Sequence, residues 1–79
     1  MALLRLFAAA REAAGTDRVV LDGATVGDIL EQAIASFGDP FAMVLERSRV
    51  WVNGQPAPDD TPLSDGDEVA VLPPVSGGL

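Results

Sequence analysis

One amphipathic helix constrains what this chain can fold into more than any other feature. The helix spans residues 25–37, and its apolar stripe consists of Val26, Ile29, Leu30, Ala33, Ile34 and Phe37. This spacing places all six side chains on one helical face. Thr25 is suited to cap the start, Asp28 stands three residues later as in a capping box, and Gly38 follows as a stop. A single helix of this kind has to bury its stripe against another layer, and the rest of the chain must supply that layer.

Strand patterns flank this helix on both sides. Alternating or apolar sequence predicts strands over residues 2–7, 18–21, 49–53 and 67–72. Asn53-Gly54 has the chemistry of a tight type I′ hairpin turn, and the prolines that follow it favour a loop or a sheet edge. The order strand, strand, helix, strands predicts an α+β domain in which one main helix packs on one face of a mixed sheet.

Two shorter helical segments are also expected. Residues 8–14 are rich in alanine, which favours helix, and Gly15 is positioned to end that segment. Residues 41–47 indicate another short helical turn. Pro40 disfavours helical backbone at Asp39 before it, so we expect a break between the long helix and this turn.

The sheet face turned away from the long helix carries the residues of most interest. By strand alternation, Phe7 and Leu72 project from that face. If the first and last strands are neighbours, these two side chains form an apolar patch beside the C-terminal segment, and such patches often mark partner sites. Trp51 also points outward by alternation and faces a partner on that interpretation, whereas a register slip of one residue would bury it in the core.

Length and charge limit the classes of function. With 79 residues the chain has room for one small domain and little room for a large catalytic cleft. Its net charge of −7 argues against nucleic acid and favours a basic protein partner. No apolar run approaches the roughly 20 residues of a membrane span, and no secretion signal is recognisable. Since cysteine is absent as well, we expect no membrane association and a cytoplasmic location.

The residue types that are missing argue against independent catalysis. The chain has no His, Cys, Tyr or Lys. It therefore lacks the usual general base, the thiol nucleophile, the Schiff-base amine and the soft metal ligands. We expect no catalytic residue, no metal and no cofactor bound by this chain itself.

The C-terminal segment has the composition of a thin, extensible tail. Pro73 and Pro74 end the last strand and stiffen the backbone. Gly77 and Gly78 have no Cβ, so their backbone fits a channel too narrow for other residues. We therefore predict a folded domain over residues 1–74 and a flexible tail over residues 75–79 that presents its carboxyl end to another protein. The alternative is an ordinary frayed terminus.

Taken together, several motifs resemble those of a known family. They are residues 6–12 (LFAAARE), Thr25-Val26, Val52-Asn53-Gly54 and the block from Leu63 to Gly78 (LSDGDEVAVLPPVSGG). With this order of elements, the chain resembles the ubiquitin-like sulfur carriers of the MoaD and ThiS type over nearly its whole length. Within that group it is most similar to the small subunit of molybdopterin synthase, which combines the Arg-Glu turn, Asp-Gly-Asp-Glu-Val and the Pro-Pro-Val-x-Gly-Gly ending.

The resemblance implies a β-grasp fold and a carrier cycle in which partner enzymes do the chemistry. An E1-like adenylating enzyme would use ATP to adenylate the carboxylate of Gly78, and a sulfur donor would convert the adenylate to a thiocarboxylate. In a molybdopterin synthase heterotetramer, the tail would then enter the large subunit and deliver this sulfur to a pterin precursor of the molybdenum cofactor.

The same resemblance assigns roles to individual residues. Gly78 is the point of covalent attachment, and Phe7, Arg11 and Leu72 are partner contacts, although Arg11 could equally be a solvated helix residue. The residues that thread into the partner are Pro73, Pro74, Val75, Ser76 and Gly77.

Two other functions stay open at this point. The chain could carry sulfur for thiamine, cysteine or another thiolation pathway, or it could be a ubiquitin-like binding module whose tail is never modified. Leu79 departs from the family pattern, which ends on the second glycine. It is either a precursor residue removed by a peptidase or a remnant of expression cloning, and we expect the 79-residue chain to be inactive as a carrier.

Overall fold

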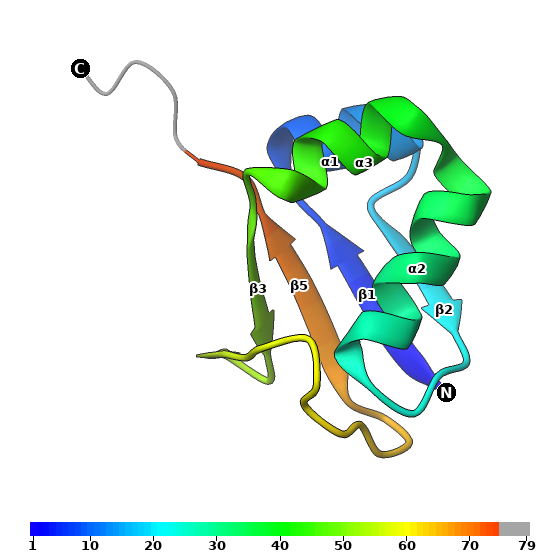
Figure 1. Cartoon of the computed structure of the whole chain (residues 1–79), viewed down its shortest axis with the longest axis vertical. Helices are drawn as coiled ribbons and strands as arrows, with labels where there is room; N and C mark the ends of the chain where they lie inside the picture. Colours follow the sequence, from blue (N-terminus) through cyan, green and yellow to red (C-terminus); the bar gives the residue numbers. More distant parts are fainter. Residues whose placement is uncertain (75–79) are drawn as a thin grey trace.

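Within residues 1–74, which the computed structural model describes, five strands form one mixed sheet accompanied by three helices (Figure 1). The strands are β1 (Ala2–Leu6), β2 (Arg18–Leu21), β3 (Arg49–Val52), β4 (Gln55–Pro56) and β5 (Glu68–Leu72). The helices are α1 (Ala8–Ala14), α2 (Val26–Phe37) and α3 (Asp39–Glu46). The predicted strands and the long helix are confirmed, and each boundary lies within two residues of the predicted one.

The first and last strands lie side by side in the centre of the sheet. The strand order is β2-β1-β5-β3-β4. β1 and β5 run parallel, whereas every other neighbouring pair is antiparallel. α2 crosses one face of the sheet, and α1 and α3 lie at the end where β1 and β5 finish (Figure 1). This arrangement is the β-grasp fold, and it confirms the prediction of a mixed sheet with one main helix on one face.

The core lies between α2 and the centre of the sheet. Four residues of the predicted helical stripe are buried, and the other two, Ile34 and Phe37, are half-buried against them. The strands contribute alternate residues to the same core, as their period of two requires. These strand residues are Ala2, Leu4, Leu6, Val69 and Val71.

The break between α2 and α3 is shorter than expected. α3 begins at Asp39, so the prediction that Pro40 would keep Asp39 out of a helix is wrong. Gly38, with φ of 87°, ends α2 and turns the chain directly into α3. Proline is tolerated in the first helical turn because its missing N–H would have no partner there. The sharp turn places Phe41 in the core with no exposed surface, its ring 5.3 Å from that of Phe37 in an edge-to-face contact.

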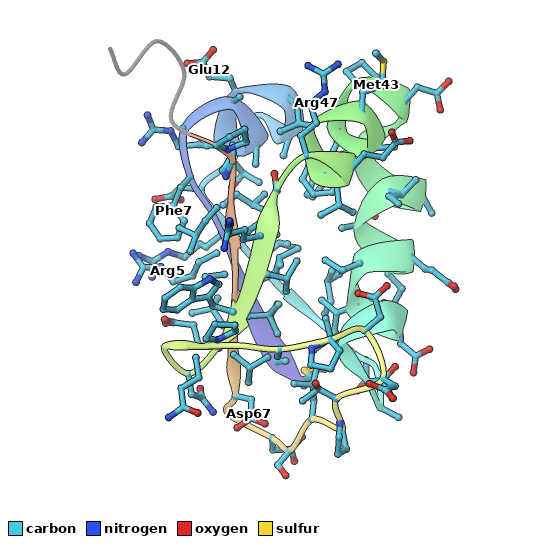
Figure 2. All side chains as sticks on the ribbon, turned by 60° about the vertical axis from the view of Figure 1, so that its left-hand side comes forward. Arg5, Phe7, Glu12, Met43, Arg47 and Asp67 are labelled. Atoms are coloured by element: carbon cyan, nitrogen blue, oxygen red, sulfur yellow. The ribbon has the colours of Figure 1, made fainter. Side chains whose placement is uncertain are left out.

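A pair of polar side chains joins the β3–β4 hairpin to the start of β5. Asp67, at the end of the molecule away from α1 and α3 (Figure 2), accepts hydrogen bonds from the Ser64 N–H at 2.8 Å and from Asn53 Nδ2 at 3.1 Å. Asn53 Oδ1 in turn accepts from the Glu68 N–H at 3.0 Å. Asn53 and Gly54 both have positive φ, 49° and 85°, which confirms the type I′ turn. The Asn-Gly and Asp-Gly-Asp motifs therefore fix the β3–β4 hairpin against the start of β5.

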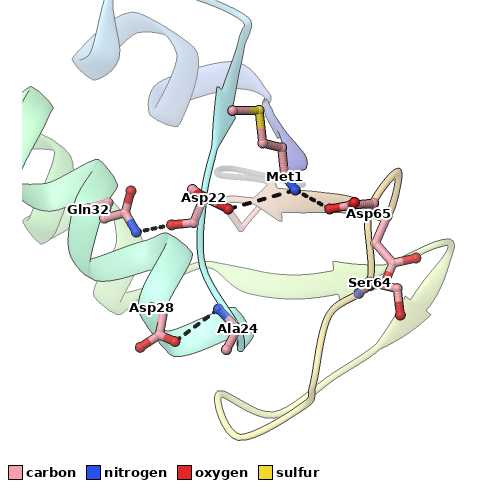
Figure 3. A network of polar contacts seen from close by, with 8 residues as sticks. Met1, Asp22, Ala24, Asp28, Gln32, Ser64 and Asp65 are labelled. Atoms are coloured by element: carbon pink, nitrogen blue, oxygen red, sulfur yellow. Dashed lines mark hydrogen bonds and ion pairs between the residues drawn. The ribbon is translucent and has the colours of Figure 1, made fainter.

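A second polar cluster ties down the start of β1 (Figure 3). The amino group of Met1 donates a hydrogen bond to the carboxylate of Asp65 and lies 3.8 Å from Asp22. The bond to Asp65 raises the pKa of the amino group, and the same bond lowers the pKa of Asp65. Both groups are exposed, so this contact orients the chain end more than it stabilises the fold.

The predicted capping box of α2 is present beside this cluster. Thr25 Oγ1 accepts a hydrogen bond from the Asp28 N–H at 3.2 Å. The Asp28 carboxylate accepts from the N–H groups of Ala24 and Thr25 at 3.1 and 3.2 Å, and Figure 3 draws the bond to Ala24. The cap holds the first turn of α2 in place over the sheet.

We expect Asp67→Asn to lower the melting temperature at pH 7, because the amide accepts hydrogen bonds less strongly than the carboxylate. The Ser64 N–H, followed by the Asn53 side chain, holds the pKa of Asp67 below its ordinary value of 3.8. A lowered pKa in the folded state stabilises the fold above the ordinary pKa, and this stabilisation is lost as the pH falls through the lowered pKa. The gap in melting temperature between wild type and variant should therefore shrink between about pH 5 and pH 2.

Thermal melts across this pH range, with Asp60→Asn as the matched control at an exposed turn residue, test the prediction. Equal melting temperatures for wild type and Asp67→Asn at pH 7, or a gap that widens on acidification, would contradict it.

Candidate partner-binding face and tail root

The sheet face opposite α2 presents alternate strand residues outward, and we call it the open face. Because the core residues of β1 and β5 point under α2, their neighbours along each strand turn the other way. Figure 2 shows Arg5 and Phe7 on the side of the molecule away from α2. The residues of the open face are Leu3, Arg5, Phe7, Arg18, Val20, Arg49, Trp51, Glu68, Ala70 and Leu72.

Phe7 and Leu72 lie next to each other where β1 and β5 end. The residues just before them, Leu6 and Val71, are paired in register. Both Phe7 and Leu72 are half-buried and lie outside the core. The guanidinium group of Arg5 lies 5.3 Å from the centre of the Phe7 ring, a cation–π contact that holds the ring against the sheet. The outward orientation predicted from strand alternation is confirmed, while the role of both residues in partner contact stays a prediction.

Trp51 lies on the same face, further toward the sheet edge. It is paired in register with Ala70 of β5 and with Pro56 of β4. Its side chain is half-buried and does not belong to the core. The alternative of a core tryptophan produced by a slipped register is therefore wrong, and Trp51 belongs to the open face.

The chain leaves the sheet beside this face, at a point that we call the tail root. Pro73 is half-buried and Pro74 is exposed, and both follow β5 directly. On the helical side, the tail root borders a groove of about 430 Å³. Besides the two prolines, the groove is lined by Ala9, Pro40, Met43, Val44 and Arg47.

The remaining predicted site residues fall in two groups. Arg11 lies exposed on α1, outside the lining of this groove. Val75, Ser76, Gly77 and Gly78 lie outside the described residues, as do Leu79 and the predicted tail over residues 75–79. Their roles stay predictions.

The described residues offer surfaces for contact with another protein. Among residues 1–74, no polar or charged side chain is buried, and no three acidic residues lie close enough to hold a metal ion. In the same part of the chain, no helix has both the length and the apolar composition needed to cross a bilayer. The central strands β1 and β5 contribute to the open face, and α1 and α3 contribute to the groove. The tail root lies between these two surfaces.

Two features of this region were missed at the level of sequence. Met43, which is 67% exposed, lies off the apolar side of α3 that buries Phe41 and faces the groove instead. The sequence signal for this was a methionine two residues after Phe41, which a helix places on a different side from Phe41. The second feature is the alignment of Arg5 with Arg18 across β1 and β2, which depends on strand register.

Comparison with known sequences places the chain among sulfur carriers. The model of the ThiS family matches residues 4–78. The molybdopterin synthase sulfur carrier subunit of Escherichia coli K12 is 45% identical over 76 residues, covering 91% of this chain and 93% of that protein. Small archaeal modifier protein 1 of Haloferax volcanii is 40% identical over 85 residues, covering 94% of this chain and 97% of that protein.

Solved structures agree with this placement. The solution structure of small archaeal modifier protein 1 from Methanosarcina acetivorans superposes with a TM-score of 0.86 and 31% identity. The match covers 98% of this chain and 95% of the other. The fold and the connectivity are therefore those of the ubiquitin-like β-grasp carriers.

Because the open face lies outside the core, we expect substitutions on it to cost little stability. Phe7→Ala and Leu72→Ala should each lower the melting temperature by about 4–8 °C, the shift that about 1 kcal/mol produces in a domain of this size. Phe41→Ala, the matched substitution of a fully buried ring, should cost about 3–5 kcal/mol and shift the melt several times further. Thermal melts of the three variants decide the matter. Equal losses at Phe7 and Phe41 would show that Phe7 is part of the core.

Proposed function

The chain belongs to the ThiS family, and from this membership we propose that it is the sulfur-carrier subunit of a molybdopterin synthase. The observation that carries the proposal is its similarity to the Escherichia coli subunit of that name along most of both chains. The family match extends to Gly78, the residue that the proposal makes the sulfur carrier.

The proposed chemistry takes place on the carboxylate of Gly78, within partner enzymes. A carboxylate oxygen attacks the α-phosphorus of ATP in an E1-like adenylating enzyme, so that pyrophosphate leaves and an acyl-adenylate forms. This step is needed because a free carboxylate has no good leaving group. A sulfur donor then displaces AMP and leaves a thiocarboxylate, whose sulfur passes to a pterin precursor held by the large subunit.

Residues 1–74 serve this cycle by recognition. The open face provides an apolar docking surface at Phe7 and Leu72, directly beside the point where the tail begins. Pro73 and Pro74 remove backbone donors and fix φ, so the chain cannot continue the sheet beyond β5 and is directed toward the partner. A carrier that docks in this way needs no catalytic side chain of its own.

A chain ending at Gly78, incubated with its adenylating enzyme, ATP and a sulfur source, should gain the mass expected for exchange of one oxygen for sulfur. Intact-protein mass spectrometry measures this directly. Gly78→Ala places a methyl group next to the reacting carboxyl, and misplacement of a reacting group costs on the order of 100-fold in rate. The rate of its adenylation, measured by ATP–pyrophosphate exchange, should fall by about this factor. Its melting temperature should stay unchanged.

The chain that retains Leu79 is the matched control, since its Gly78 carboxyl is part of a peptide bond. It should show no mass shift. Absence of thiolation in the chain ending at Gly78, under conditions that thiolate a known carrier, would rule the proposal out.

A second candidate is a carrier or modifier for another pathway. The 40% identity to small archaeal modifier protein 1 favours it, because the similarity covers nearly all of both chains. Thiolation for thiamine or cysteine synthesis would use the same carboxylate, and only the partner that docks on the open face would differ. A ubiquitin-like module that binds without covalent modification is the remaining alternative.

Co-purification from the native organism distinguishes these functions. We expect the tagged chain to capture a pterin-binding large subunit and an adenylating enzyme, because on this proposal both bind the open face. Phe7→Ala should weaken this capture, since interface anchors typically cost more than about 1 kcal/mol when truncated. Capture of a thiazole-forming or cysteine-forming enzyme instead would assign the chain to the second candidate. Capture of partners without any thiocarboxylate would favour the binding module.

A further inference from the structure

The open face has a charge opposite to that of the molecule as a whole. Three of the five arginines, Arg5, Arg18 and Arg49, lie on this face. Glu68 is the one acidic residue among the strand positions that form it, although 12 acidic residues give the chain its net charge of −7. Asp17 lies at the edge, just before β2, with an oxygen 4.0 Å from Arg18 Nε. The other eleven acidic residues lie in the helices and loops, so arginine predominates among the strand positions of the open face.

Two of these arginines are placed directly opposite each other. Arg5 and Arg18 are in register in the antiparallel pair of β1 and β2. Like charges in directly opposite positions destabilise a sheet. The nearby acids compensate only loosely, with 3.8 Å between Arg5 and Glu68 in a pair that remains substantially exposed. Such exposed pairs contribute little. The contact of Arg5 with the Phe7 ring occupies none of its N–H donors in a hydrogen bond, so both guanidinium groups can bind an anion that arrives from outside.

The surroundings of the arginine pair are those of a protein interface. In register across the sheet, Arg5 is followed by Ala70 and then by Trp51. Ala70, which lies between Arg5 and Trp51 in the sheet, has a small side chain and is half-buried. Tryptophan and arginine are among the residue types enriched at interface hot spots.

We propose that the open face recognises a protein surface that carries carboxylates, with Arg5 and Arg18 as the paired binding site for an acidic side chain and Trp51 as the adjacent apolar anchor. This inference rests on the proposed function, because the occupant is the docking surface of the adenylating enzyme. Each guanidinium has several N–H donors in a planar fork that matches a carboxylate. The net charge favours a basic protein partner, and such a partner would bind outside the open face.

A protein fits this face better than other anionic partners. Nucleic acids and anionic membranes present an extended, uniformly negative surface, which the eleven acidic residues of the helices and loops would repel. A protein surface places a few carboxylates among apolar groups, as the mixture of arginines, Phe7, Leu72 and Trp51 requires.

The test compares binding of the adenylating enzyme to the chain ending at Gly78 and to its Arg5→Gln and Arg18→Gln variants by titration calorimetry. Each variant should weaken binding about tenfold, and the loss should shrink at high salt, which screens charge pairs. Ala35→Glu changes the net charge by the same amount on the exposed side of α2 and should leave Kd within about twofold. The melting temperature of Arg18→Gln should be equal to or higher than that of wild type, because a like-charge contact is removed.

A second measurement does not depend on the enzyme. Trp51 is the only tryptophan in the chain, so its fluorescence reports on the open face. At low salt, a blocked hexaglutamate peptide should change this fluorescence in wild type and not in the Arg5→Gln, Arg18→Gln double variant. Hexalysine should have no effect on either.

The outcomes separate this inference from the proposed function. Thiolation and enzyme binding that are the same in wild type and arginine variants would overturn the arginine assignment and leave the carrier function intact. If the arginine variants lost melting temperature and enzyme binding together, the role of Arg5 and Arg18 would be structural, and the inference would also be overturned. Tighter binding of a single-stranded oligonucleotide or of phosphatidylserine vesicles at the same residues would replace the protein partner. A hexaglutamate response without thiolation would support the face and reject the carrier function.

Discussion

The parallel pairing of β1 with β5 is the contact on which the rest of the structure depends. It joins Leu3–Leu6 to Glu68–Val71, two segments from opposite ends of the chain. Closing so long a loop costs entropy, which is regained only when α2 buries the paired strands. β2 and β3 then add to the outer edges of this pair. Phe7 and Leu72 form a patch only because these two strands end side by side. A partner that binds the patch therefore recognises the folded domain and not the unfolded chain.

Strand alternation allows the same two strands to provide both stability and recognition. Leu4 and Val69 are fully buried under α2, and their neighbours Arg5 and Ala70 form part of the open face. A substitution at one position therefore affects the core, whereas a substitution at the next position affects the surface. This separation suits a carrier, because its docking surface can change to suit different enzymes while its core does not. The relatives fit this view, because the chain is similar along most of its length both to a protein named as a sulfur carrier and to one named as a modifier.

Local features of the fold were predictable from the sequence, and features that depend on contacts between distant segments were not. The cap at Thr25, the stop at Gly38 and the turn at Asn53-Gly54 each follow from a few adjacent residues, and each is present. The start of α3 at Asp39 was missed because the rule that proline disfavours helix before it yields where the chain has just turned at a glycine. The opposition of Arg5 and Arg18 could not be seen, because cross-strand register depends on packing of the whole sheet.

The uneven distribution of charge gives the molecule a preferred direction of approach. Eleven of the twelve acidic residues lie in the helices and loops, so on this proposal an acid-bearing partner is attracted mainly to the arginines of β1, β2 and β3. Complementary potentials of this kind raise association rates and suppress wrong orientations more than they add affinity. Pro73 and Pro74 directly follow Leu72 of the open face, so an encounter guided in this way also brings the tail root to the partner. A carrier that has to leave one enzyme and meet the next benefits from fast, oriented encounters more than from tight ones, and a few exposed arginines on an acidic domain supply them.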